Sequence, residues 1–179
     1  MLDFSALRLQ HAEEMHVSAI CDLVNLTYRG ATGWTTEAAI MQGDRTNLAE
    51  VGAALRKPGA AFFMVHHHDQ LIACIYVAKE NTHAFIGFFS VHPDWQEKGV
   101  GKYLLAHAES YAQSTLGIDK LRMYVISQRA ELVSFYRRRG YCSTGCVEVC
   151  PQHLGTPRVS GLTIDYLEKS LDHNLSSKI

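Results

Sequence analysis

Hydrophobic and polar positions along the chain repeat with two different periods, and the changes of period divide it into elements. Apolar runs of strand length, alternating or continuous, predict seven strands, at residues 4–9, 61–66, 71–78, 82–91, 121–126, 141–150 and 162–167. Apolar residues three and four positions apart predict helices at 16–28, 99–115 and 129–139. The mixture of strands and helices predicts an α/β protein.

A further helical segment is expected between the first helix and the second strand. A threonine cap at Thr35 and Thr36 precedes the acidic Glu37, which is a typical helix start. Gly43 interrupts the segment, and Asn47 begins its second piece, which runs to about residue 55. The complete order is strand, helix, broken helix, three strands, helix, strand, helix and two strands.

The stretch V-H-P-D-W-Q-E-K-G-V-G-K, residues 91–102, connects the fourth predicted strand to the next helix. The first N–H groups of a helix have no partner within it, and the helix dipole places about half a positive charge there. Gly99 and Gly101 let a ligand's phosphate come close to the backbone. The stretch therefore predicts an anion-binding site.

Two common nucleotide motifs do not fit these residues. The dinucleotide fingerprint requires a third glycine, where this chain has Leu104. The P-loop requires serine or threonine after Gly101 and Lys102, where this chain has Tyr103. A nucleotide-binding protein that uses the same glycine turn is therefore only an alternative interpretation.

The pattern that remains is V-x-P-x-x-Q-x-x-G-x-G, formed by Val91, Pro93, Gln96, Gly99 and Gly101. It resembles the acetyl-coenzyme A site of the GNAT superfamily of N-acetyltransferases. The resemblance implies a mostly antiparallel mixed sheet of about seven strands, splayed at the coenzyme site and flanked by about four helices. It covers nearly the whole chain, so residues 1–179 are expected to form a single domain with a peripheral tail beyond about residue 171.

The resemblance also assigns coenzyme-binding residues. It implies that Phe89, Ser90 and Val91 present a free strand edge to the pantetheine arm. The N–H of Val91 would donate to the thioester oxygen, a contact worth about 3 kcal/mol in related acyl chemistry. The residues that would surround the pyrophosphate, mostly through backbone N–H groups, are Gln96, Glu97, Lys98, Gly99, Val100, Gly101 and Lys102.

A second stretch, residues 129–141, resembles another conserved part of the superfamily. Phe135, Tyr136 and Tyr141 match its pattern, whereas Arg129 replaces the usual asparagine. The family tyrosine protonates the leaving thiolate, and a phenol with a pKa near 10 can do so at neutral pH. The resemblance implies this role for Tyr136 and a coenzyme contact for Arg129; the alternative is that Tyr136 is a core aromatic residue.

The general base is not identified by the sequence. Some members of the superfamily have a glutamate eleven positions before the motif glutamine, and here that position is Phe85. Proton removal through water to Glu80, to His83 or to a group on the first helices is expected instead.

The acceptor is expected to contact the stretch 27–37, where aromatic and charged residues lie between glycines. Tyr28, Arg29, Trp34 and Glu37 are the predicted substrate-binding residues. Glu37 or Asp44 could hold an ammonium group, and Arg29 or Arg45 could hold a carboxylate. The alternative is a structural loop that Trp34 packs on the core.

Composition limits the other classes of function. The formal net charge of -1 gives no overall attraction to nucleic acid. No apolar run is long enough to span a membrane, and five irregularly spaced cysteines favour a reducing cytoplasm. Residues 66–68 are consecutive histidines, which chelate poorly on a strand because neighbours point to opposite faces, so no metal is expected.

These observations predict an N-acetyltransferase in which an amine attacks acetyl-coenzyme A directly in a ternary complex. A domain that binds acetyl-coenzyme A as a sensor, without turnover, is the alternative from a different class. The acceptor is a small-molecule or peptide amine that the sequence does not identify. Members of this superfamily often dimerise through late strands, which makes a homodimer a candidate assembly.

Overall fold

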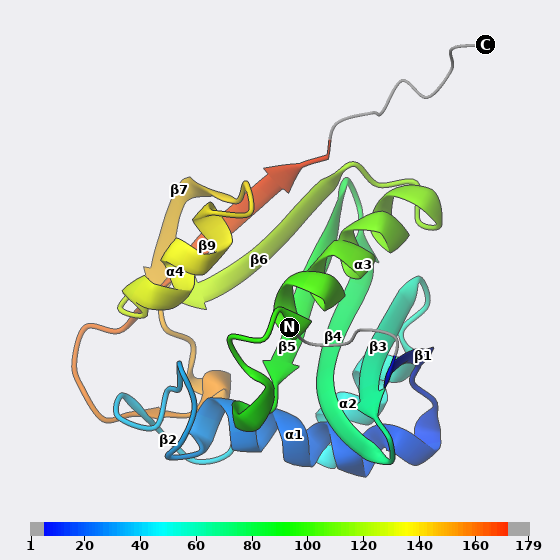
Figure 1. Cartoon of the computed structure of the whole chain (residues 1–179). Coiled ribbons are helices and arrows are strands. Elements are labelled where there is room, and N and C mark those ends of the chain that lie inside the picture. Colours follow the sequence, from blue (N-terminus) through cyan, green and yellow to red (C-terminus); the bar gives the residue numbers. More distant parts are fainter. Residues whose placement is uncertain (1–5, 172–179) are drawn as a thin grey trace.

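A computed structural model describes residues 6–171 of the chain (Figure 1). Its main feature is a seven-stranded sheet in the order β1-β3-β4-β5-β6-β9-β7. The strands are β1 (Leu7–His11), β3 (Ala60–His67), β4 (Gln70–Glu80), β5 (His83–Val91), β6 (Lys120–Ile126), β9 (Thr163–Ser170) and β7 (Cys142–Val149). All neighbours are antiparallel except β5 and β6, which confirms the predicted mixed sheet.

The parallel pair β5–β6 joins two halves of the sheet. Its register contains only Ala84 opposite Leu121 and Phe85 opposite Arg122. Beyond these residues the two strands diverge, as the ribbon shows (Figure 1). The second half of β5 therefore has no strand beside it on the β6 side, and the predicted splay is confirmed.

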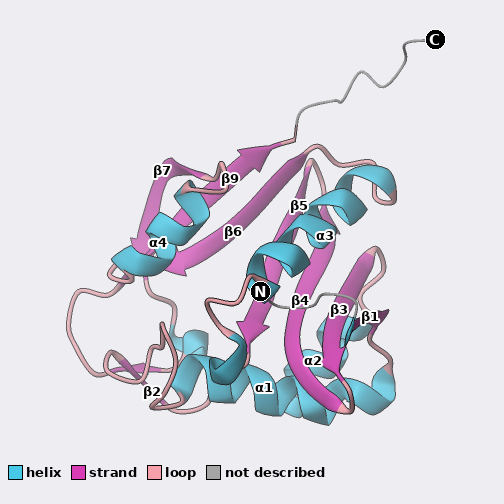
Figure 2. Ribbon diagram, viewed as in Figure 1, coloured by secondary structure: helices cyan, strands magenta, loops and turns pink. Residues whose placement is uncertain are grey.

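Helices cover both faces of the sheet (Figure 2). Helices α1 (Val17–Arg29) and α2 (Leu48–Arg56) pack on one face, against side chains such as Phe62 and Met64 of β3. Helix α3 (Val100–Ser114) packs on the opposite face, against Phe63 of β3. Helix α4 (Ala130–Arg137) joins the same core layer through side chains such as Leu132 and Tyr136. The alternation of buried side chains along β3 thus supplies both core layers. No helix within residues 6–171 is long and apolar enough to cross a membrane.

The prediction of a helix that starts at Thr35 is wrong. Residues 30–46 form turns and a two-residue strand, β2 (Met41–Gln42), which pairs with β8 (Thr156–Pro157). The Thr36 hydroxyl binds the carbonyls of Tyr28 and Gly30 and accepts from the N–H of Ala38 at 3.3 Å, so it stabilises a single turn that does not continue as a helix. The second piece of the prediction is confirmed, because the Asn47 side chain caps α2 by accepting from the N–H of Glu50.

Smaller differences concern the ends of the chain and the connections. The first strand begins at Leu7 and extends to His11, two residues beyond its predicted end. Three short 3₁₀ helices occur in the connections, at Glu14–His16, Pro93–Trp95 and Gln152–Leu154. Residues 1–5, which include the predicted strand start, and the predicted peripheral tail beyond residue 171 lie outside the described residues.

Candidate active site

A β-bulge in β5 separates its paired first half from its open second half. Phe88 lies at the bulge with a φ of 47°, and the register with β4 shifts between Cys74 and Tyr76. Past the bulge the pairing resumes, with Ser90 opposite Cys74 and Val91 opposite Ala73.

The backbone of Val91 faces away from β4. His92 donates its N–H to Ile72 at 2.8 Å. Because ladder bonds alternate along an antiparallel pair, the N–H and C=O groups of Val91 point to the opposite edge, where β6 has diverged. The Val91 carbonyl accepts from Gln96 Nε2 at 3.0 Å there. The end of β5 therefore presents main-chain polar groups on the unpaired side of the strand.

Two cavities lie on either side of this open edge. The larger, of about 460 Å³, extends between β5 and β6 toward α1 and α2. The smaller, of about 90 Å³, lies between the end of β5, the first turn of α3 and α4. The residues that line both cavities are Tyr28, Phe89, Arg129, Leu132 and Tyr136. The cavities therefore meet at the edge of β5.

The start of α3 borders the smaller cavity. Gly99 is the N-cap residue with a φ of 89°, a conformation that favours glycine. A Cβ atom on Gly101 would lie 3.4 Å from Val91 Cγ2 and 3.5 Å from Phe89 Cζ, so a larger side chain would fill this part of the cavity. Glu97, Lys98 and Lys102 are exposed, whereas Val100 is buried.

Gln96, predicted to contact the coenzyme, uses its side chain within the protein. Its Nε2 donates to the Val91 carbonyl at 3.0 Å, and its Oε1 accepts from the N–H of Trp34. Trp34 is 39% exposed and packs on Phe135 at a centroid distance of 5.9 Å. Gln96 thus links the loop after α1 to the end of β5.

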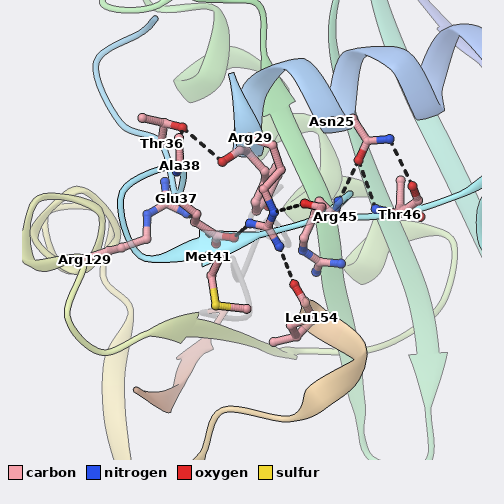
Figure 3. A network of polar contacts seen from close by, with 12 residues as sticks. Asn25, Arg29, Thr36, Glu37, Ala38, Met41, Arg45, Thr46, Arg129 and Leu154 are labelled. Carbon is pink, nitrogen blue, oxygen red and sulfur yellow. Dashed lines mark hydrogen bonds and ion pairs between the residues drawn. The ribbon is translucent and has the colours of Figure 1, made fainter. Parts of the chain in front are cut away.

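A buried ion network connects this loop to α4 (Figure 3). Glu37 is 4% exposed and Arg129 is 6% exposed. Arg129 Nη1 lies 2.9 Å from Glu37 Oε1, and Arg29 binds the other carboxylate oxygen. Arg129 also donates to Thr35 Oγ1 at 2.7 Å, while Arg29 donates to the carbonyls of Gly43 and Leu154. Both oxygens of Glu37 are therefore occupied by guanidinium groups.

Two tyrosines lie where the cavities meet. The Tyr28 hydroxyl donates to the Phe89 carbonyl at 3.3 Å, and burial raises the pKa of Tyr28 to about 12. Tyr136 is 5% exposed and packs on Phe89 at a centroid distance of 6.4 Å. Burial raises the pKa of Tyr136 far above its usual value, so its phenol stays protonated at neutral pH.

The residues predicted as relays for proton removal do not lie at this site. Glu80 and His83 face each other at 3.7 Å, at the hairpin end of β4 and β5, and neither lines the larger or the smaller cavity. His83 stands eight residues before Val91, about 26 Å along a strand with a rise of ~3.3 Å per residue. Phe85, at the position of the family glutamate, lines the larger cavity.

Three further residues with a charged or imidazole side chain line the larger cavity. They are Arg45, Glu50 on α2 and His153 in the loop before β8. Arg45 was predicted, together with Arg29, as a group that could hold a carboxylate, whereas Glu50 and His153 were not identified from the sequence. Their convergence depends on the path of two long loops, for which local sequence carries no signal. Within residues 6–171 there is no group of three side chains suited to a metal ion.

Comparisons with known proteins agree with this architecture. Residues 18–141 match the model of the acetyltransferase (GNAT) family. The sequence matches no curated protein. Among solved structures, the ribosomal-protein-S18-alanine N-acetyltransferase from Escherichia coli is similar with a TM-score of 0.69 and 13% identity, over 97% of this chain and 99% of that chain.

Two other similar structures have different described substrates. A variant of the spermidine N-acetyltransferase from Vibrio cholerae gives a TM-score of 0.68 at 18% identity, over 93% of this chain and 94% of that chain. The IAA acetyltransferase from Bacillus cereus gives a TM-score of 0.68 at 14% identity, over 92% of this chain and 99% of that chain. At these identities the similarities show the fold alone.

Proposed function

The chain belongs to the acetyltransferase (GNAT) family, and from this premise we propose that it transfers the acetyl group of acetyl-coenzyme A to an amine by direct attack in a ternary complex. The observation that carries the proposal is the meeting of two cavities at the unpaired edge of β5. One cavity suits the arm of the donor and the other suits the acceptor. A thioester at their junction would be open to attack from the larger cavity.

The coenzyme is assigned to the smaller cavity and the start of α3. The pantetheine arm would pair with the edge formed by Phe89, Ser90 and Val91, where the outward groups are those of Val91. The pyrophosphate would bind the exposed N–H groups at the start of α3, helped by the helix dipole. The side chain of Gln96 would support this turn through Val91 and Trp34.

The chemical step follows from this placement. The amine nitrogen attacks the thioester carbon, and the N–H of Val91 donates to the oxygen that becomes negative. The C–S bond then breaks, and Tyr136 gives its proton to the leaving thiolate. The products are the N-acetylated amine and coenzyme A, with the amine proton transferred to a base.

For that base we propose Glu50, on the second helix. Glu37, the other carboxylate on the larger cavity, is bound by two arginines and is poorly placed to take a proton. Glu50 lines the cavity and accepts a single side-chain hydrogen bond, from Thr46 Oγ1 at 3.0 Å. The ion network of Arg29, Glu37 and Arg129 would instead hold the loop and α4 in position around the acceptor.

Coenzyme binding and turnover test the proposal separately. Acetyl-coenzyme A at a hundred times its dissociation constant should stabilise the protein by about 2.7 kcal/mol, and ATP or NAD should not. A panel of amines should then release free thiol from acetyl-coenzyme A. Binding without turnover on any amine would indicate a sensor, and an equal shift with ATP would indicate a nucleotide site.

A further inference from the structure

Arg45 is held in a fixed place at the larger cavity. It lies in the loop between β2 and α2, and Asn25 of α1 binds the backbone of this loop (Figure 3). Asn25 Oδ1 accepts from the N–H groups of Arg45 at 2.8 Å and Thr46 at 3.0 Å, and Asn25 Nδ2 donates to the Thr46 carbonyl at 3.0 Å. The position of Arg45 is therefore set by helix α1.

The guanidinium of Arg45 is incompletely paired. Its Cζ lies 5.2 Å from the ring centroid of Tyr28 and 6.0 Å from that of Phe88. Its side-chain hydrogen bond is a long one, 3.4 Å from Nη2 to the hydroxyl of Tyr124. No carboxylate of residues 6–171 lies within ion-pair distance of Arg45. A guanidinium has five N–H donors, so most of these are available to a ligand in the cavity.

No carboxylate of the described residues that line the cavity forms an ion pair with Arg45. Arg29 and Arg129 share Glu37 between them, and Glu50 has no arginine within ion-pair distance among the described residues. A charge removed from water is costly unless it is paired. An anionic group in the cavity would supply the missing partner, and the planar fork of arginine matches a carboxylate.

We propose that the acceptor is a small amine that also carries a carboxylate, an amino acid in its chemical class, with the carboxylate bound by Arg45. This inference rests on the proposed function. Tyr28 lies between the two groups, because Arg45 stacks on its ring and its hydroxyl binds the Phe89 carbonyl. The guanidinium of Arg45 and the end of β5 therefore contact the same tyrosine side chain.

The remaining walls fit the rest of such a molecule. Phe85, Phe88 and Leu154 line a cavity of about 460 Å³, which leaves room for an apolar or aromatic side chain. A polyamine would place additional ammonium groups beside Arg45, where like charges repel. The charge of Arg45 therefore favours an amino acid over a polycation at its end of the cavity.

The experiment compares amines that differ only in the carboxylate. Thiol release from acetyl-coenzyme A is measured with phenylalanine, its amide and phenethylamine, with leucine and isopentylamine, and with spermidine. We expect kcat/KM to be about 10- to 100-fold higher for each amino acid than for its decarboxylated amine, the range of charge-assisted hydrogen bonds. Arg45→Gln should reduce this ratio to near one, and Arg45→Lys should leave an intermediate ratio.

The matched control is Arg56→Gln, on the exposed surface of α2, which should keep the wild-type ratio. A wild-type enzyme that uses the decarboxylated amines or spermidine as well as the amino acids overturns the inference but leaves the acetyltransferase function. If acetyl-coenzyme A does not raise the melting temperature of the wild-type protein, both the inference and the proposed function are overturned. If Arg45→Gln does not fold, the wild-type ratio and Arg45→Lys decide the question.

Discussion

At the scale of single residues, the chemistry depends on two tyrosines that meet the same strand edge. The Tyr28 hydroxyl is committed to the Phe89 carbonyl, whereas Tyr136 donates to no acceptor within the described residues. Both phenols stay protonated at neutral pH because burial raises the pKa of each. Tyr136 is thus the phenol whose proton is not already shared with a carbonyl oxygen of the described residues.

Replacing Tyr136→Phe should lower kcat by about 10- to 100-fold, toward the lower end of what a positioned general acid supplies. The affinity for acetyl-coenzyme A should change less than threefold, because the ring and its packing remain. The wild-type rate should not fall as pH approaches 10, since the raised pKa keeps this phenol protonated there. Steady-state kinetics from pH 6 to 10 measure both effects.

Two variants show whether the effect is specific. Tyr111→Phe, on the far part of α3 against Phe63, should keep the full rate. Tyr28→Phe should have a smaller effect than Tyr136→Phe, because its proton is already donated to a carbonyl. Full activity of Tyr136→Phe at every pH would show that this tyrosine only packs.

At the scale of single residues, sequence reasoning predicted local backbone structure better than side-chain contacts. The pattern of Gln96, Gly99 and Gly101 correctly indicated a glycine turn at the start of a helix beside β5. The side-chain contacts of Gln96 with Val91 and Trp34 could not be predicted, because Trp34 lies 62 positions earlier in the chain. Motifs describe local backbone shape, whereas side-chain partners depend on the tertiary path.

At the scale of elements, ion pairs hold the loop after α1 in place, and regular secondary structure does not. Glu37 joins it to α4 through Arg129, a contact between residues 92 positions apart. The threonine and glutamate at the start of this loop resemble a helix cap, and sequence alone predicted a helix there. The ion pairs with Arg29 and Arg129 show why the prediction was wrong, since Glu37 binds distant side chains instead of a local N–H.

Replacing Glu37→Gln should therefore lower the free energy of unfolding by about 3–5 kcal/mol, because two buried guanidinium groups lose their carboxylate. Urea denaturation measures the change. The control is Glu14→Gln, which breaks the ion pair with Arg56 at a surface where both side chains are more than half exposed. That change should be about 1 kcal/mol or less. Equal effects of the two variants would show that the Glu37 network does not stabilise the fold.

At the scale of the whole molecule, the sheet is two half-sheets joined by one short pair of strands. Sequence periodicity correctly predicted the order of the seven strands of the main sheet and the four helices, because most of them have an apolar face; β7 is the exception and is exposed at every position. It could not predict that Arg45, Glu50 and His153 would line one cavity, since their loops meet only in the assembled fold. The cavity exists because β5 and β6 pair at two positions and then separate.

A ligand that binds where β5 and β6 separate should act as an additional strand between the half-sheets. Acetyl-coenzyme A should therefore slow hydrogen exchange most at residues 89–91 and at the first turn of α3, measured by mass spectrometry of peptides. Residues 63–67 of β3 provide the internal control, because strands on both sides already pair with them. Saturating ATP should produce no such protection. If the slowed amides were instead those of β7, which is an edge strand of the sheet, the coenzyme would bind away from the open side of β5. The assignment of both cavities would then be wrong.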